Sequence, residues 1–248
     1  MMIVMEKQTA LELENVYKSY EQVLAVKELS LLVETGEVYA LIGPNGAGKT
    51  TTVKMITGLL EVDKGMIKIF GHEIRNDSVE AKRFLGYIPD NPYVYPYLTG
   101  REFLQFTGDL YEINRDETNK RIKELLKLYD LGEVIDGLFS EYSRGNQQKT
   151  VILANLLHEP KLLVIDEPIV GLDVQSQLIT KKLFKKFTEN GGAILLCTHT
   201  LTFAEEVAHR IGVIDKGKLM AEGTLSDLRK MKKHLKASLE ELYLEITK

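Results

Sequence analysis

Short runs of hydrophobic residues alternate with longer segments of helical periodicity along most of the chain. Three of these runs occupy residues 38–42, 162–165 and 193–197, and none of them contains a charged position. Uninterrupted apolar runs of this length are typical of strands that are buried on both faces of a sheet. Polar residues follow each run, and in open α/β sheets ligands bind beyond the carboxyl ends of the strands. The pattern therefore predicts an α/β fold with a ligand site along one edge of its sheet.

The two ends of the chain carry the period of antiparallel strands instead. Before about Val33, hydrophobic residues such as Leu11 and Leu13 alternate with polar ones, which predicts antiparallel β-structure. Near the C-terminus, residues 210–214 and 218–221 flank a short polar segment with Gly217, a pattern that favours a hairpin turn. We therefore expect an N-terminal antiparallel β subdomain and a C-terminal hairpin.

The middle of the chain, about residues 89–158, is predicted to be mostly helical. Thr99 and Glu102 have the spacing of a capping box, which marks the start of a helix. A second helix is expected after Ser143 and should stop before Pro160, because proline cannot continue a helix. A helical insert therefore divides the α/β core in two.

Two further helices are expected from periodicity. One is an amphipathic helix in the insert, whose apolar positions recur at i, i+3, i+4 and i+7, namely Ile122, Leu125, Leu126 and Tyr129. The other is a final helix from about Leu225 to Leu244. A basic run at residues 229–236 is interpreted as a solvated helix face, with contact to a membrane or a partner as the alternative.

Composition narrows the class of protein. The chain has 248 residues, 44% of them hydrophobic, which is enough for a sizeable core. Its formal net charge is −4, so no overall basic field favours nucleic acid, and no nucleic-acid partner is expected.

Several features indicate a cytoplasmic chain. Its one cysteine, Cys197, cannot form an internal disulfide, which fits a reducing compartment. No apolar stretch approaches the roughly 18 residues that cross a bilayer, and the first seven residues make a poor signal peptide. If the protein serves a membrane process, we expect another chain to span the membrane.

The strongest motif follows the first apolar run. Eight consecutive residues match G-x-x-x-x-G-K-[ST] at every position, namely Gly43, Pro44, Asn45, Gly46, Ala47, Gly48, Lys49 and Thr50. A predicted strand precedes this loop and a predicted helix follows it; Thr51, the first residue of that helix, is also expected to bind ATP. Glycines let several backbone N–H groups face one anion, and the helix N-terminus adds partial positive charge. Lys49 is expected to reach the β- and γ-phosphates and Thr50 to bind Mg²⁺. The loop alone does not identify the nucleotide, because GTPases, kinases and motor ATPases share it.

An acidic pair, Asp166 and Glu167, ends the second apolar run. Adjacent carboxylates at the end of a buried strand are costly unless a cation joins them. Asp166 is suited to hold Mg²⁺, usually through a water. Glu167 lies one residue further on, where it can polarise the water that attacks the γ-phosphate.

His199 follows the third apolar run. A lone histidine at a strand end is more often structural than catalytic. This one, however, is expected at the edge of the sheet where Lys49 and Asp166 point. It can hydrogen-bond the γ-phosphate and orient the attacking water there.

The segment before the acidic strand resembles the signature of ABC ATPases, normally L-S-G-G-Q. Its residues here are Tyr142, Ser143, Arg144, Gly145 and Asn146. The other family motifs follow in order: an adenine-stacking aromatic at Tyr20, the Walker A loop (residues 43–50), the Walker B strand (162–167), a D-loop with Asp173, and a switch histidine at His199. The resemblance covers nearly the whole chain. It implies an α/β fold with a P-loop NTPase (RecA-like) core, an N-terminal antiparallel β subdomain and a helical insert.

The resemblance also implies a mechanism. In this family two ATPase domains stack head to tail and bury two ATP molecules between them, so ATP and Mg²⁺ are the expected cofactors. Each ATP would lie on one chain's Walker A loop and under the other chain's signature, where Ser143 and Gly145 face the γ-phosphate. A homodimer or a heterodimer with another ABC ATPase domain is expected, and it should depend on ATP.

Two segments depart from the family pattern. Arg144 replaces the first glycine of the signature, and Asn146 replaces its glutamine. Asp90 stands where the family usually has a glutamine that touches Mg²⁺ and the attacking water. Aspartate can bind Mg²⁺, so Asp90 joins Thr50 and Asp166 as an expected metal ligand.

The resemblance implies a transport-coupled ATPase. The expected role is the ATP-hydrolysing subunit of an ABC transporter, bound to a separate permease at the inner face of the cell membrane. The C-terminal tail looks like that of exporter-type subunits. A soluble ABC ATPase in iron–sulfur assembly or another non-transport role is the alternative. We expect an ABC ATPase domain at residues 8–224, with a helical subdomain at about 89–158, and a helical tail at 225–248.

One surface hypothesis follows from the resemblance. Tyr93, Tyr95 and Tyr97 lie in the region that receives a coupling helix of the membrane subunit in ABC transporters. They are expected either to form part of that docking surface or to pack inside the helical insert.

Overall fold

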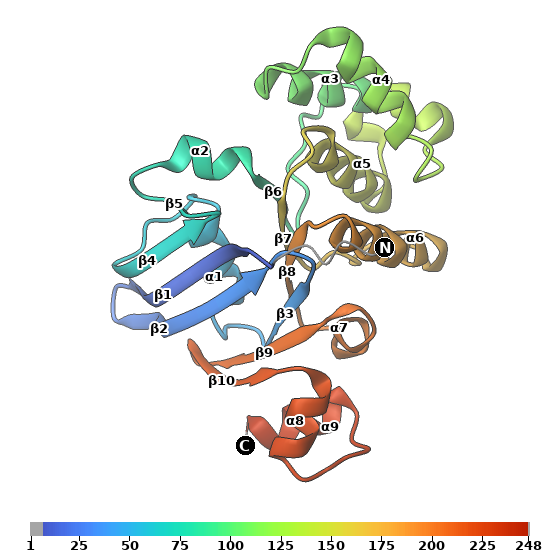
Figure 1. Cartoon of the computed structure of the whole chain (residues 1–248). Coiled ribbons are helices and arrows are strands. Elements are labelled where there is room, and N and C mark those ends of the chain that lie inside the picture. The colour runs from blue at the N-terminus through green and yellow to red at the C-terminus, as the bar shows by residue number, and fades with distance from the viewer. Residues whose placement is uncertain (1–6, 248) are drawn as a thin grey trace, which may run out of the picture.

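A computed structural model describes residues 7–247. The prediction about a signal peptide rests mainly on residues 1–6, which lie outside the described residues, as does Lys248. Within the described part the chain folds into two sheets, a helical insert and a C-terminal helical tail (Figure 1).

The larger sheet has six strands in the order β10-β9-β3-β8-β7-β6. The strands are β3 (Val38–Ile42), β6 (Leu85–Ile88), β7 (Leu162–Asp166), β8 (Ala193–Thr198), β9 (Arg210–Asp215) and β10 (Lys218–Gly223). All neighbours are parallel except β9 and β10, which form the predicted hairpin. Lys216 and Gly217 turn this hairpin with positive φ at both residues, as a two-residue type I′ turn requires. The three strands predicted from apolar runs are confirmed; β6 was not predicted.

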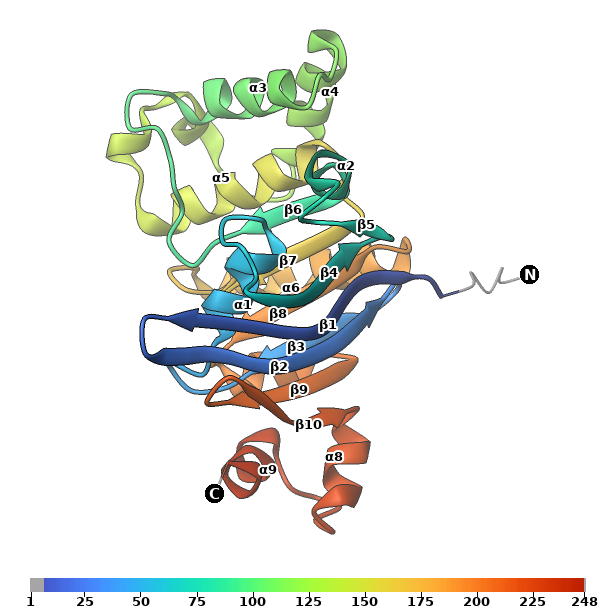
Figure 2. The same cartoon turned by 90° about the vertical axis from the view of Figure 1, so that its left-hand side faces the viewer.

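The smaller sheet is antiparallel, in the order β2-β1-β4-β5. Its strands are β1 (Thr9–Tyr20), β2 (Val23–Glu34), β4 (Lys64–Ile69) and β5 (His72–Glu73). The predicted N-terminal antiparallel β-structure is confirmed. The sequence had not indicated that two strands from beyond the phosphate loop complete this sheet, which faces the viewer in Figure 2.

Helix α1 (Lys49–Ile56) lies between the two sheets. Val53, Met55 and Ile56 are fully buried, in one cluster with inward residues of the antiparallel sheet and with Tyr39 and Leu41 of β3. Side chains alternate between the faces of a strand, so Ala40 and Ile42 belong to the core on the opposite face. Burial on both faces explains the continuous apolar runs.

The opposite face of the six-stranded sheet is covered by helices. These helices are α5 (Arg144–Leu157), α6 (Val174–Glu189) and α7 (Leu201–Val207). The insert, which ends with α5, also contains α3 (Gly100–Leu110), α4 (Arg115–Leu125) and two short 3₁₀ turns (Gly132–Asp136 and Phe139–Glu141). A further short helix, α2 (Ser78–Arg83), precedes β6. Figure 1 shows α3 and α4 beyond α5, away from the sheets.

Helix starts in the insert follow the sequence signals. Thr99 and Glu102 form both bonds of a capping box at α3, and the Ser143 side chain accepts from the backbone N–H of Asn146 at α5. The predicted helix through Tyr129 is wrong at its end, because α4 stops at Leu125 and three-residue turns follow. Tyr129 is nevertheless fully buried and contacts the hydroxyl of Thr180 at 2.7 Å.

The predicted single C-terminal helix is wrong. The tail forms α8 (Leu225–Met231) and α9 (Leu239–Ile246), because Lys233 adopts a positive φ and Ser238 begins a new helix with a capping box to Glu241. The basic run therefore spans a helix end and a turn rather than one solvated helix face. Figure 1 places this tail at the opposite end of the molecule from α3 and α4.

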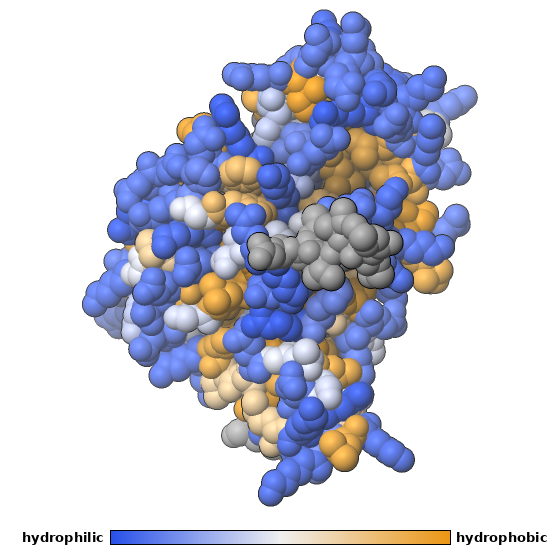
Figure 3. Space-filling model, viewed as in Figure 1, coloured by the Kyte–Doolittle hydropathy of each residue, from blue (hydrophilic) through white to orange (hydrophobic). Residues whose placement is uncertain are grey.

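No helix in residues 7–247 is long and apolar enough to cross a membrane. The face shown in Figure 3 is mostly hydrophilic, with hydrophobic residues gathered in smaller patches.

Candidate active site

The phosphate loop connects β3 to α1, as its motif requires. Gly46 and Gly48 both have positive φ, and Gly48 is the N-cap of α1. A Cβ at Gly48 would come within 2.6 Å of the Ala25 carbonyl oxygen on β2, so a side chain has no room there. The antiparallel sheet thus supports the loop from one side.

Lys49 lies across this loop and is almost fully buried. Its Nζ donates to the carbonyl oxygens of Gly43 at 2.7 Å and Pro44 at 3.1 Å. The ammonium group is therefore held over the loop by the backbone that is predicted to bind phosphate.

Thr50 and Asp166 meet across the site. Thr50 Oγ1 donates to Asp166 Oδ2 at 2.9 Å, although the residues are 116 positions apart. Asp166 is 3% exposed, and burial raises the pKa of its carboxyl group. A hydroxyl and a buried carboxylate are hard oxygen ligands, which Mg²⁺ prefers, with waters and phosphate oxygens completing its shell. The residues present thus fit a magnesium ion.

Glu167 is held by residues at the end of the neighbouring strand, β8. Its Oε2 accepts from Thr198 Oγ1 at 2.8 Å, and its Oε1 accepts from the backbone N–H of His199 at 2.9 Å. The Nδ1 atom of His199 lies 2.6 Å from the same Oε1. Glu167 has a φ of 53°, a backbone conformation that is uncommon outside glycine and is often found at functional sites.

Thr198 is a site residue that the sequence reasoning missed. It is fully buried, and besides donating to Glu167 it accepts from the backbone N–H of Thr200 at 3.0 Å. A signal was present: Thr198 directly precedes His199, and β7 and β8 were expected to end at the same edge of the sheet. A hydroxyl at that position could have been expected to face a carboxylate.

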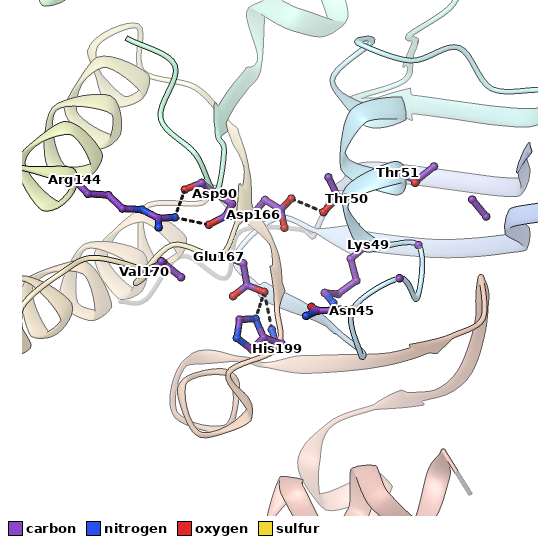
Figure 4. A pocket seen from close by; sticks show the side chains of 13 residues that line it. Asn45, Lys49, Thr50, Thr51, Asp90, Arg144, Asp166, Glu167, Val170 and His199 are labelled. Atoms are coloured by element: carbon purple, nitrogen blue, oxygen red, sulfur yellow. Dashed lines mark hydrogen bonds and ion pairs between the residues drawn. The ribbon is translucent and has the colours of Figure 1, made fainter. Parts of the chain in front are cut away.

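These groups line one cavity of about 440 Å³ (Figure 4). Of the predicted site residues, the lining includes Asn45, Gly46, Gly48, Lys49, Thr50, Thr51, Asp90, Arg144, Asp166, Glu167 and His199; Ala25 and Val170 complete it. The structure thus brings together residues from the Walker A loop, the acidic strand end and the histidine strand end. Their chemical roles stay predictions.

Tyr20 is not part of this lining. It ends β1 at the tip of the β1–β2 hairpin and is 44% exposed. Ala25, on β2, reaches the cavity instead. Stacking of adenine on Tyr20 therefore stays a prediction.

The start of α5 presents the signature residues. Ser143 is exposed at the N-cap, whereas Tyr142 is buried against Phe139. A Cβ at Gly145 would lie 2.6 Å from the carbonyl oxygen of Gly171 in the same chain. Packing within the chain therefore requires glycine at position 145, whether or not the backbone there also approaches a phosphate group.

Asp173 caps α6. Its side chain accepts from the backbone N–H and the hydroxyl of Ser176, and its carboxylate contacts Lys149 of α5 at 3.3 Å. The bonds from Ser176 lower the pKa of Asp173 to about 2. This residue of the predicted D-loop thus joins α5 to α6.

The two departures from the family pattern contact each other. Arg144 Nη2 donates to Asp90 Oδ1 at 3.1 Å, and Figure 4 shows this contact at the wall of the cavity. The predicted Mg²⁺ ligand Asp90 therefore faces a guanidinium group in the described structure.

Comparison with known proteins agrees with this geometry. The family described as "ABC transporter" matches residues 26–170. The SkfA peptide export ATP-binding protein SkfE of Bacillus subtilis (strain 168) is 38% identical over 212 residues, which are 86% of this chain and 88% of that protein. The chain therefore belongs to the ABC transporter family. It is an ATP-binding subunit of that family, with an ATPase fold.

Solved structures place the chain in the same group. An ATP-binding subunit of an ABC transporter superimposes with a TM-score of 0.92 at 35% identity, covering 97% of this chain and all of that one. The ATP-binding cassette MJ0796, in a dimeric post-hydrolysis state bound to ADP and Pi, gives a TM-score of 0.77 at 25% identity, covering 87% of this chain and 98% of that one. The predicted fold class is confirmed, and nothing in these similarities supports the iron–sulfur alternative.

Proposed function

We propose that this chain hydrolyses ATP at the cavity lined by Lys49, Asp166 and Glu167, and that hydrolysis is coupled to transport. One observation carries the proposal: the Thr50–Asp166 pair and the Glu167–His199 pair, from three separate strand ends, line the same cavity as the phosphate loop. These are the groups needed to bind a triphosphate, hold a divalent cation and activate a water.

The phosphate loop binds and orients the nucleotide. Backbone N–H groups at the start of α1 face the phosphates, and the helix N-terminus favours their negative charge. Lys49 exchanges its two carbonyl partners for phosphate oxygens. Thr50 and Asp166 would hold Mg²⁺, which neutralises charge that develops on the phosphates.

Glu167 is the proposed general base. Its carboxylate accepts a proton from the attacking water, and the three bonds from Thr198 and His199 fix its orientation. His199 stands beside it at the cavity wall, where it is proposed to orient the water and the γ-phosphate. Thr198 acts on the reaction only through Glu167.

A second chain is proposed to complete the site. Residues 142–146 would cover the ATP of the partner, and the MJ0796 cassette, at 25% identity, is dimeric. Ser143 is exposed at a helix N-terminus, as that role needs. Whether the partner is a second copy of this chain or another ABC ATPase domain, the contact is expected to require ATP.

The proposed membrane partner is a separate permease at the inner face of the cell membrane, and export is the proposed direction. The similarity to SkfE, whose name refers to peptide export, supports this direction. Tyr93 and Tyr97 are 79% and 86% exposed, whereas Tyr95 packs against Phe103 and Phe106 of α3. Tyr95 is still 43% exposed, so the proposed docking surface centres on Tyr93 and Tyr97 with Tyr95 beside them, since aromatic residues are enriched at interfaces.

The substitution Glu167→Gln tests the proposal. The proton acceptor is lost while the phosphate loop and the Thr50–Asp166 pair remain. We therefore expect steady-state hydrolysis to fall on the order of 100-fold or more, with ATP binding and ATP-dependent dimerisation retained. Glu206→Gln is the matched control, because this α7 carboxylate pairs with Lys181 and does not line the cavity. Near-normal hydrolysis by the Glu167 variant would refute the assignment.

A further inference from the structure

Arg144 and Asp90 form an ion pair that joins two parts of the chain. Arg144 Nη2 donates to Asp90 Oδ1 at 3.1 Å, to the Asp90 carbonyl oxygen at 3.3 Å and to Asn91 Oδ1 at 3.3 Å. One guanidinium nitrogen is thus surrounded by three oxygens of one short segment. The family motifs normally have an uncharged residue at each of these two positions, so both charges of the pair are departures from the usual pattern.

The two residues belong to different parts of the fold. Asp90 lies two residues beyond the end of β6, at the edge of the six-stranded sheet, whereas Arg144 is the first residue of α5 in the helical insert. The stem of Arg144 also lies against Gly171, where an added Cβ would meet Arg144 Cγ at 3.2 Å. Gly171 belongs to the loop that leaves Glu167. Arg144 therefore contacts the segment after β6 and the loop after β7 at once.

Arg144 balances the negative charge that Asp90 brings to the cavity. Asp90, Asp166 and Glu167 all line the same cavity, which Lys49 shares. The negative charges of Glu167 and Asp90 add to the burial that raises the pKa of Asp166. Without Arg144, the carboxylate of Asp90 would add unbalanced negative charge where a triphosphate has to bind. With Arg144 beside it, the pair is neutral.

We propose that Asp90 and Arg144 form a clamp, which holds the signature end of α5 against the segment after β6 in the nucleotide-free chain and which Mg²⁺ and ATP open. The opening step rests on the proposed ATP-binding function; the closed clamp does not. A half-exposed guanidinium group holds a carboxylate weakly. Thr50 and Asp166 would hold a divalent cation beside Asp90, and that cation would attract the carboxylate with twice the charge of Arg144. Once released, Arg144 is free to face the phosphates of an ATP bound on a second chain.

The clamp can be measured as a distance inside the nucleotide-free chain. Lys64 in β4 and Lys120 in α4 are both exposed, and cysteines at these positions can carry nitroxide spin labels. Cys197, the only native cysteine, is fully buried, so it does not compete for the label. Mixing labelled chain with excess unlabelled chain restricts the measurement to distances within one chain.

Breaking either side of the clamp should alter this distance. Asp90→Asn and Arg144→Gln are each expected to lower the ratio of chains at the wild-type distance to chains at other distances about threefold, which equals about 0.7 kcal/mol and lies within the range of exposed ion pairs. The exchanged variant Asp90→Arg/Arg144→Asp should restore that ratio. Arg101→Gln is the matched control: it breaks a pair of similar exposure, with Asp136, that lies wholly inside the insert. Unchanged distances in both single variants, or an exchanged variant that behaves like them, would overturn the clamp.

Adding nucleotide distinguishes a failure of the opening step from a failure of the proposed ATP-binding function. In chains that also carry Glu167→Gln, Mg²⁺ with ATP should shift the wild-type clamp to the distances of the Arg144→Gln variant, while ATP with a chelator should leave it closed. An equal shift without Mg²⁺, or no shift although radiolabelled ATP binds in the presence of Mg²⁺, would refute opening by the cation. Failure of radiolabelled ATP to bind would instead refute the proposed function and leave the nucleotide-free result standing.

Discussion

The substitution Thr198→Val removes the hydroxyl group that donates to the proposed general base. Valine has nearly the shape of threonine but lacks the hydroxyl, so Glu167 Oε2 loses its partner at 2.8 Å. The backbone N–H of Thr200 loses its acceptor as well. Both groups are then left without a partner in a site where Thr198 is fully buried.

The size of the effect follows from the charge on Glu167. A hydrogen bond to a charged group contributes about 1.5–3 kcal/mol, and about 1.4 kcal/mol corresponds to a tenfold change. Part of this energy holds the carboxylate in the orientation that accepts a proton. We therefore expect kcat to fall by about tenfold while KM for ATP stays within about twofold, because the phosphate loop is untouched.

The assay is steady-state phosphate release over a range of ATP concentrations, with urea unfolding measured in parallel. Thr198→Ser is the matched control, since it keeps the hydroxyl and should keep kcat within about twofold of wild type. If Thr198→Val hydrolyses ATP as fast as Thr198→Ser, Thr198 does not position Glu167. If KM rises and kcat does not fall, the residue serves nucleotide binding instead.

Three further predictions concern other parts of the chain. Thr50→Ala should raise the Mg²⁺ concentration at half-maximal hydrolysis by at least about tenfold, because one of the expected protein oxygen ligands is lost; an unchanged midpoint would count against the Thr50–Asp166 site. Tyr97→Ala, combined with Tyr93→Ala, should reduce transport in the assembled complex and spare hydrolysis by the isolated chain; normal transport would remove these tyrosines from the docking surface. Burial lowers the pKa of His158 to about 4 from 6.5, so the unfolded chain binds more protons between these values and stability is lost as pH falls. Between pH 8 and pH 5 the loss from this group is about 2 kcal/mol, and a His158→Phe variant should lack that part of the pH dependence in urea unfolding.

The sequence predicted those elements whose burial leaves a periodic signal. Strand β3 lies at the predicted residues 38–42, because its side chains are buried on both faces and none can be polar. Helix α5 begins after Ser143, because the cap is a local contact between neighbouring residues. The tail was predicted wrongly as one helix, since the apolar spacing continues across the break. The capping box of Ser238 with Glu241 was the local signal that was overlooked.

The sequence predicted which strand ends form the site, but not the contacts between their side chains. Sheet topology brings Lys49, Asp166 and His199 to one edge, and polar residues after apolar runs reveal that edge. The contact between Asp90 and Arg144 joins residues 54 positions apart through exposed side chains, and exposed side chains leave no hydrophobic pattern. Each was recognisable as a departure from the family, but only the fold shows that the two departures contact each other.

Lys49 stabilises the phosphate loop through hydrogen bonds within the loop itself. Its ammonium group has two oxygen partners within the loop, the carbonyl groups of Gly43 and Pro44, and these bonds hold the curvature of the loop. If phosphate oxygens replace these carbonyls, as we propose, they bind a loop that is already ordered, and little conformational entropy is lost in the exchange. On this proposal, the contribution of Lys49 to nucleotide affinity is a difference between two sets of lysine contacts. Weakening the resident set is therefore a route to tighter binding that needs no new contact to ATP.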